Sequence, residues 1–167
     1  DQLEILNEHW IEEMMMQATR KSVFAVSPKI YNKDFTVNYA GVCLDKDAEN
    51  YLYSLCAHDS NMDIGYEGML CHVRNVTATT RDCMLFEKKK WVELAQIRNL
   101  ISGYEEVDMC LRALAFKKQN VFVPYSECRL IKSSVIKRDS IEFKSQYYNE
   151  IENDIRLNAN WKNLNLA

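Results

Sequence analysis

Two residues that could recognise a nucleobase, Glu67 and Phe116, stand well apart in the sequence. Glu67 lies in the stretch 63–69, where two of the four glycines flank it and predict a turned backbone. Phe116 closes a helical stripe with Met109 and Ala113, which faces away from the predicted buried face. A carboxylate beside an aromatic face suits a flat, cationic ligand that donates hydrogen bonds. The simpler interpretation is a surface carboxylate and a ring that covers a secondary apolar cluster.

A second combination has the residue types of a metal-dependent nuclease. A predicted strand ends in Glu87-Lys88-Lys89, with Asp63 upstream and Gln96 on the helix that follows. Two carboxylates can hold a divalent ion that activates water, and a lysine can assist. A Glu-x-Lys triplet is common in charged chains, and Glu87 before three lysines also suits the exposed start of a helix. A nuclease built on Asp63, Glu87 and Lys89 is therefore the alternative function.

Cys56 and His58, with Cys71 and His72 further along, have the residue types of a zinc site. A structural zinc ion needs about four ligands that converge on it. Neighbouring side chains of a strand point to opposite faces, so the ligands of such a pair would diverge. Buried cysteines and surface histidines are the favoured interpretation, and we expect neither a metal nor another cofactor.

The composition limits the remaining functions. The chain has 167 residues, enough for one packed core, so we expect a single domain over residues 1–167. Its net charge of −3 argues against sequence-independent binding of duplex nucleic acid. Its four glycines disfavour Rossmann and P-loop sites, which use glycine at fixed positions. No apolar run approaches the ~20 residues of a membrane span, and the first residue, Asp1, indicates a piece of a longer chain.

The cysteines indicate a reducing environment. They are Cys43, Cys56, Cys71, Cys83, Cys110 and Cys128. Most of them lie inside apolar runs, and neither a CxxC pair nor a dense framework is present. Free cysteine behaves as a small buried hydrophobe, so we interpret these residues as reduced core cysteines of an intracellular protein.

The periodicity of apolar residues predicts an α+β fold. The expected helices are 2–20, 88–102, 104–117 and one from Asp139 to about residue 157. The expected strands are 22–28 and 35–44, joined by a turn at 32–34, then 69–76, 83–86, 121–123 and 129–133. Together they predict a mostly antiparallel sheet packed on two consecutive helices, with further helices at both ends.

This order of segments resembles the cap-binding middle domain of orthomyxovirus RNA polymerase basic protein 2. The likeness covers residues 60–131 and rests on short matches in the right order and spacing. They are Gly65-Tyr66-Glu67, Ile101-Ser102-Gly103 and Ala113-Leu114-Ala115-Phe116. The last predicted helix and Asn158-Ala159-Asn160-Trp161 also fit. The departures make the chain resemble a divergent, thogotovirus-like member of the family.

In that family, two aromatic rings clamp the 7-methylguanine base of an mRNA cap, and a carboxylate accepts hydrogen bonds from the base. Methylation makes the base cationic, so it gains a cation–π contribution and a charge-assisted hydrogen bond. The resemblance places one ring at Phe116 and the carboxylate at Glu67. It places a supporting aromatic at Phe24 and a lysine at Glu87 or Lys88.

The second ring of the family falls on Asp63, which cannot stack. Tyr66 and Trp91 are the rings that could replace it. The stretch after Val123 is also too short for the loop that closes over the cap. The resemblance therefore implies that the fold is kept while binding of the cap is weak or lost.

The implied function is non-catalytic, in a viral RNA polymerase subunit that serves cap-snatching and initiation of transcription. The implied partners are the other polymerase subunits, viral RNA and capped host mRNA, without a membrane. The implied locations are the host cell nucleus and the virion. A plain protein-interaction domain is a third interpretation.

Overall fold

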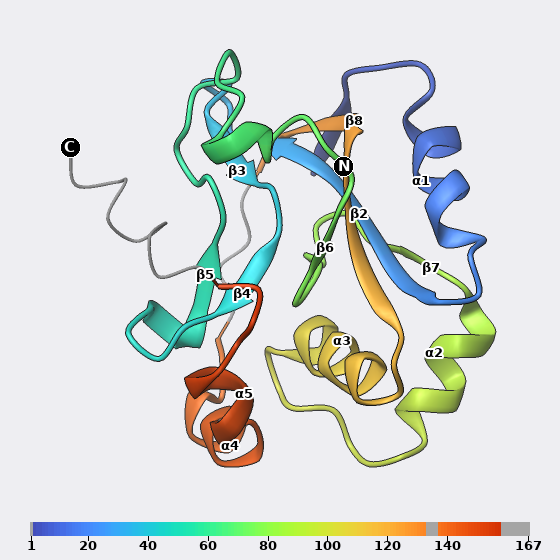
Figure 1. The fold of residues 1–167 in the computed structure, drawn as a ribbon, viewed down its shortest axis with the longest axis vertical. Helices are drawn as coiled ribbons and strands as arrows, with labels where there is room; N and C mark the ends of the chain where they lie inside the picture. The colour runs from blue at the N-terminus through green and yellow to red at the C-terminus, as the bar shows by residue number, and fades with distance from the viewer. Residues whose placement is uncertain (1, 133–136, 158–167) are drawn as a thin grey trace.

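The computed structural model describes residues 2–132 and 137–157. These residues form an α+β fold, as the sequence predicts, in which helices surround a curled sheet (Figure 1). The α-helices are α1 (Trp10–Ala18), α2 (Lys88–Ala95), α3 (Glu105–Ala115), α4 (Ser140–Gln146) and α5 (Tyr148–Glu152). Two 3₁₀ turns are η1 (Glu49–Tyr51) and η2 (Tyr66–Gly68). The strands are β1 (Leu3–Ile5), β2 (Val23–Tyr31), β3 (Val37–Tyr39), β4 (Val42–Leu44), β5 (Leu52–Ser54), β6 (Arg74–Val76), β7 (Leu85–Phe86) and β8 (Gln119–Leu130).

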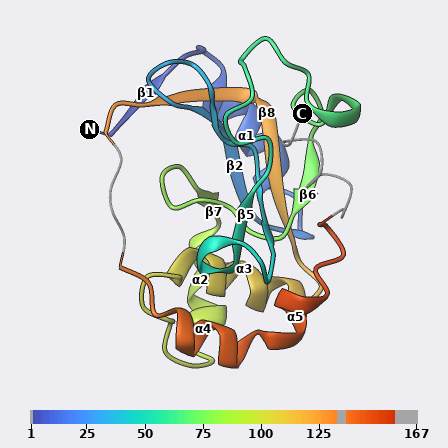
Figure 2. The ribbon, with the colours of Figure 1, turned by 90° about the vertical axis from the view of Figure 1, so that its left-hand side faces the viewer.

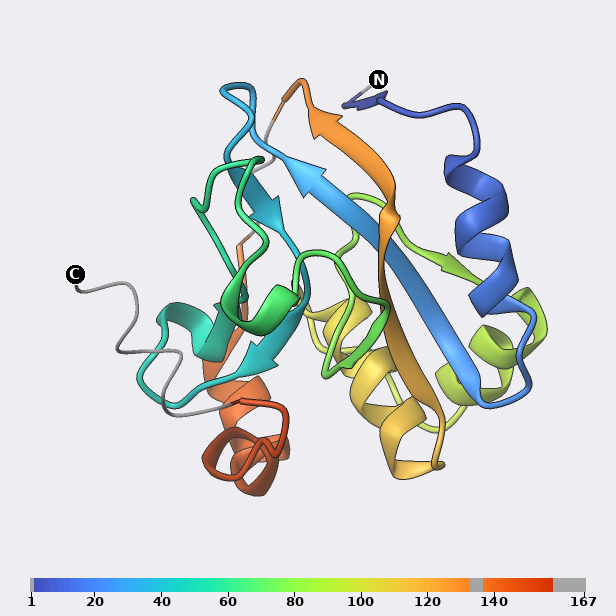
Figure 3. The same cartoon turned by 45° about the horizontal axis from the view of Figure 1, so that its top comes forward.

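The two long strands β2 and β8 form the centre of the six-stranded sheet and run parallel (Figure 3). The other strands of this sheet pair antiparallel: β1 and β6 with β8, and β3 and β7 with β2. Strands β4 and β5 form a separate antiparallel pair. The sheet is therefore mostly antiparallel, as expected, around one parallel pair whose side chains are largely buried.

Helices α1 and α3 cover different faces of the central pair. Val121 and Val123 of β8 pack in one cluster with Met14 of α1. Phe122, which lies between them in the strand, belongs to the main cluster together with Cys110 of α3. Successive side chains of a strand point to opposite faces, so the alternation in β8 separates the two clusters.

Several predicted boundaries are wrong. The segment 2–20 is not one helix, because Leu3–Ile5 pair with β8 and α1 begins only at Trp10. The strand predicted at 35–44 is broken into β3 and β4, and Gly41 between them has a φ of +114°. The helix predicted at 88–102 ends at Ala95. Only the end of the segment 69–76 is a strand.

The strands predicted at 121–123 and 129–133 are one strand, β8, at least as far as Leu130. Pro124 lacks a backbone N–H, and the chain accommodates it in a bulge. Pro28 of β2 is paired with Val123, but the next residue of β2 is paired with Glu127. Residue 133, like the matched segment 158–161, lies outside the described residues.

The last predicted helix is interrupted. Asp139 accepts a hydrogen bond from the backbone N–H of Glu142 (3.1 Å), as the predicted N-cap requires. The helical region breaks at Tyr147, which separates α4 from α5, and α5 ends at Glu152.

All six cysteines are free thiols, of which Cys43, Cys110 and Cys128 are buried. Burial raises the pKa of the Cys43 and Cys110 thiols to about 12. Among the described residues, no helix is long and apolar enough to cross a bilayer.

Candidate functional site

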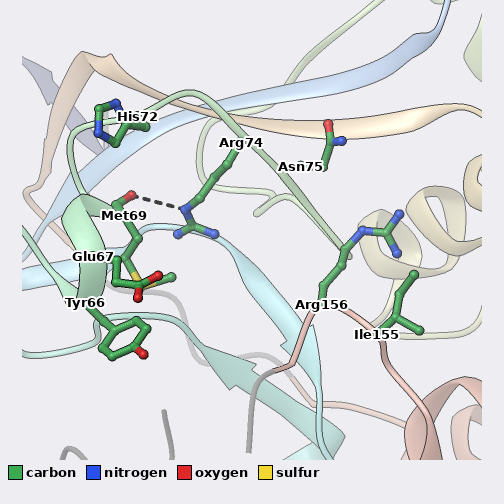
Figure 4. Close-up of a pocket in the computed structure, with 8 residues that line it drawn as sticks. All are labelled: Tyr66, Glu67, Met69, His72, Arg74, Asn75, Ile155 and Arg156. Atoms are coloured by element: carbon green, nitrogen blue, oxygen red, sulfur yellow. Dashed lines mark hydrogen bonds between the residues drawn. The ribbon is translucent and has the colours of Figure 1, made fainter. Parts of the chain in front are cut away.

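Glu67 lines a groove of about 430 Å³ between η2, the beginning of β6 and the residues after α5 (Figure 4). The lining residues are Tyr66, Glu67, Met69, His72, Arg74, Asn75, Ile155 and Arg156. Three segments that are distant in the sequence therefore contribute to one concave surface, and this surface contains one of the predicted site residues.

The local backbone presents Glu67 at the edge of the groove. Its φ is +52°, and the flanking Gly65 and Gly68 have φ values of +70° and +75°. This compact turn is closed by the backbone N–H of Gly68, which donates to the Gly65 carbonyl (3.1 Å). The turned backbone that the glycines predict is confirmed. A left-handed conformation costs a side-chain-bearing residue about 1–2 kcal/mol, and such strain concentrates at functional positions.

Arg74 places a positive charge beneath the groove. Its Nε donates to the Met69 carbonyl (3.1 Å), and its Nη2 donates to the Ala40 carbonyl. The guanidinium carbon lies 4.9 Å from the centre of the Phe122 ring. Burial lowers the pKa of Arg74. No carboxylate within the described part of the chain forms an ion pair with this guanidinium, so its charge is available to an anionic ligand.

Arg156 adds a second guanidinium group to the groove. Arg156 stands on the opposite side from Glu67 and Tyr66 (Figure 4). Its guanidinium likewise forms no ion pair with the carboxylates of the described residues. His72 lies next to η2, where a methyl group added at Gly68 would come within 3.3 Å of its Nε2. The groove thus offers a carboxylate and a phenol ring at one side and guanidinium groups elsewhere, which suits a ligand with both hydrogen-bond donors and negative charge.

Phe116 does not line this groove. It follows the last residue of α3 and is 61% exposed. Figures 1 and 2 show the end of α3 and the η2 turn in different parts of the molecule. The carboxylate and the ring that the resemblance assigns to one base are therefore not brought together.

The remaining residues assigned by resemblance also separate. Asp63 is exposed and lies in the same loop as Glu67, where its Oδ1 accepts from the Gly65 N–H (2.8 Å). Phe24 is only 1% exposed and stacks on Trp91, with 6.2 Å between ring centres. Lys88 is the exposed first residue of α2. Only Asp63 lies near Glu67. Phe24 is buried in the core, and the half-buried Trp91 lines a separate pocket with Arg81 and Glu105 rather than the groove.

The residues of the nuclease and zinc interpretations do not form a cluster. In the described ranges 2–132 and 137–157, no three His, Cys, Asp or Glu side chains gather to hold a metal. Glu87 pairs with Lys90 (3.2 Å) at the start of α2, on the other side of the sheet from the loop that carries Asp63 (Figure 1). Cys56 and His58 both have positive φ values and belong to a turn rather than a strand.

Sequence reasoning missed most of the groove. Arg74 and Asn75 begin a short strand, and nothing in their spacing distinguishes them from surface residues. Arg156 joins them only because the segment after α5 returns to this side of the molecule. Tyr66, one of the two rings considered as a replacement, does line the groove and is 38% exposed.

Comparison with known proteins identifies a distant relative. No protein-family model matches the chain. The chain is 25% identical over 133 residues to the uncharacterized protein y4gI of Sinorhizobium fredii (strain NBRC 101917 / NGR234). This match covers 76% of the chain but 14% of that protein, so the chain spans a small part of its relative's length. The relative's name states no activity, ligand or partner.

Proposed function

We propose that the chain is a non-catalytic, cap-binding-like domain of a viral RNA polymerase subunit, with binding of the 7-methylguanosine cap weak or lost. The resemblance of residues 60–131 suggests the family. The partners would be the other polymerase subunits, viral RNA and capped host mRNA, in the host nucleus and the virion. In this proposal, the groove beside Glu67 keeps a low affinity for guanine nucleotides.

The observation that carries the proposal is the set of groups in the groove. A guanine base presents two neighbouring N–H donors, and the exposed carboxylate of Glu67 can accept both. The nucleotide's phosphates need cations, and Arg74 and Arg156 supply guanidinium groups within the same groove. Tyr66 supplies one aromatic face on the side of Glu67.

The lost selectivity for the cap follows from the missing second ring. Base stacking on an aromatic side chain contributes about 1–3 kcal/mol per base. Among the described residues that line the groove, Tyr66 is the one Phe, Tyr or Trp side chain, and Phe116 lies elsewhere. A methylated, cationic base gains most from cation–π attraction when aromatic rings lie on both of its faces. With one ring, the methylated base should therefore bind little more tightly than the unmethylated base.

Backbone amide NMR during a titration with GTP tests the location of the site. We expect shift changes in residues 66–75 and 155–156, and about tenfold weaker binding in Glu67→Gln, because a charge-assisted hydrogen bond is lost. Glu142→Gln, which changes an exposed carboxylate on α4, is the matched control and should bind like the wild type. Shift changes centred on Phe116, or none at all, would overturn the proposal.

A further inference from the structure

We propose that a second surface, distinct from the groove, binds single-stranded RNA through its phosphates and through stacking of a base on Phe116. This surface, the basic end, consists of the cationic residues 20–21, 88–90 and 117–118 together with Phe116. It joins the loop between α1 and β2, the start of α2 and the turn between α3 and β8. The proposal goes beyond the nucleotide-binding groove and does not depend on it.

Hydrogen bonds bring the three segments of the basic end into one surface. From α2, Lys90 Nζ donates to the carbonyls of Val23 (2.8 Å) and Arg20 (3.3 Å). From the turn after α3, Lys118 Nζ donates to the carbonyl of Lys21 (2.9 Å). Two lysines from distant parts of the sequence therefore meet on the same short loop. Figures 1 and 3 show the start of α2, this loop and the beginning of β8 at one end of the molecule.

The charge of the basic end contrasts with that of the whole chain. It holds seven of the 21 Lys and Arg residues, although the chain has a net charge of −3. The side chains of Lys88, Lys89 and Lys117 are exposed and have no ion pair within the described residues. Lys90 alone in this surface forms a described ion pair, with Glu87. Clustered cations of this kind attract a polyanion and release its counterions on binding.

The exposed ring of Phe116 favours RNA over an acidic protein as the ligand of the basic end. Its ring is 61% exposed, and Lys117 and Lys118 follow directly. Exposed aromatic side chains within a basic surface are typical of proteins that bind single strands, because every base has a face that can stack. A patch of carboxylates would neutralise the lysines but would leave the ring without a partner. Bases in a duplex are already stacked, so the single strand is the better ligand.

Fluorescence anisotropy with a labelled single-stranded RNA of about 12 nucleotides, a length within the usual site sizes, tests the proposal. At about 50 mM salt we expect saturable binding that weakens as the salt concentration increases. A plot of the logarithm of the binding constant against the logarithm of the salt concentration should have a slope of about −0.7 for each phosphate contacted. Lys88→Glu combined with Lys89→Glu should weaken binding about tenfold and reduce this slope. The control Lys33→Glu with Lys46→Glu changes two exposed lysines elsewhere and should stay within about twofold.

Phe116→Ala separates stacking from simple attraction of charge. It should weaken binding about fivefold or more while the salt slope stays the same, because the ring carries no charge. The GTP titration measures the groove separately, so failure of the groove and failure of the basic end can be told apart. The proposal would be overturned by the absence of binding, by equal losses of affinity in the double variant of the basic end and in its control, or by an unchanged affinity in Phe116→Ala. Equal competition by a polyglutamate peptide would overturn it in favour of an acidic protein partner.

Discussion

Asp108 of α3 is a buried carboxylate that connects α3 to the segment after α2 and to Tyr147, which lies between α4 and α5. Its oxygens accept hydrogen bonds from Arg98 Nη2 (2.7 Å), Arg112 Nη2 (2.8 Å) and the backbone N–H of Ile101 (3.1 Å). The Tyr147 hydroxyl also donates to it. Because the Asp108 carboxylate is fully buried, it and the two guanidinium groups stabilise the fold only as a complete set.

Replacement of Asp108 by Asn should therefore destabilise the protein by about 3–5 kcal/mol, since two cations would lose their buried partner. Urea unfolding followed by circular dichroism measures this change. Glu93→Gln, which makes the same chemical change at an exposed position of α2, should alter the free energy of unfolding by less than about 0.5 kcal/mol. A loss below about 1 kcal/mol in Asp108→Asn would contradict this description of the network.

At the same scale, the sequence predicts part of the groove and misses the rest. The turned backbone at Glu67 could be predicted, because two flanking glycines are a local signal. The role of Arg74 could not, because it depends on the Phe122 ring and on the Met69 carbonyl. Contacts of this kind exist only once distant segments have folded together.

At the scale of elements, Gly103 connects the start of α3 to the segment before α4. The helix predicted at 88–102 would end next to Gly103, but α2 ends at Ala95 and Gly103 lies just before α3. Its φ is +78°, and an added Cβ would lie 2.4 Å from the Lys137 carbonyl oxygen and 2.8 Å from Arg138 Cα. Arg138 Nη1 also donates to the Gly103 carbonyl (2.6 Å). The glycine therefore permits a close contact between two backbones.

Gly103→Ala should destabilise the protein by more than about 3 kcal/mol, because strained φ and a backbone clash combine. Gly68→Ala is the matched control, with a φ of +75° but only the flexible His72 side chain within contact distance. It should cost about 1–2 kcal/mol, the penalty of the left-handed conformation alone. Thermal unfolding compares the two variants, and equal losses would show that the backbone contact at Gly103 has no energetic importance.

Elements with a strong local period were predicted well, and elements with competing signals were not. Helix α3 lies within the expected range, but residues 106–113 are all buried. The prediction that the stripe with Met109 and Ala113 faces away from the buried side is therefore wrong, and only Phe116 at its end is exposed. The sequence predicts two strands in place of β8, because proline normally ends a strand. In the structure a bulge accommodates Pro124, and the strand continues. The spacing of Leu3 and Leu6 is compatible with a helix as well as with a strand. Leu3 pairs with β8, and this pairing makes the segment a strand.

At the scale of the whole molecule, the structure separates two surfaces with different chemistry. The groove combines Glu67 with Arg74 and Arg156, and the basic end gathers residues 20–21, 88–90 and 117–118. The net charge of −3 gives no sign of the basic end, because net charge does not report how charges are distributed. Phe116 belongs to the basic end rather than to the groove, and this separation is the reason to expect a nucleotide site without cap selectivity.

Calorimetric titration of the protein with 7-methyl-GTP and, in parallel, with GTP tests this central claim most directly. We predict weak binding of both nucleotides, with a preference for the methylated base below about threefold, because one ring cannot form a sandwich. Glu67→Gln should weaken the binding of both nucleotides, and Phe116→Ala should change neither. A preference for 7-methyl-GTP of about tenfold or more that is lost in Phe116→Ala would contradict the account, because it would require Phe116 and Glu67 to hold the same base.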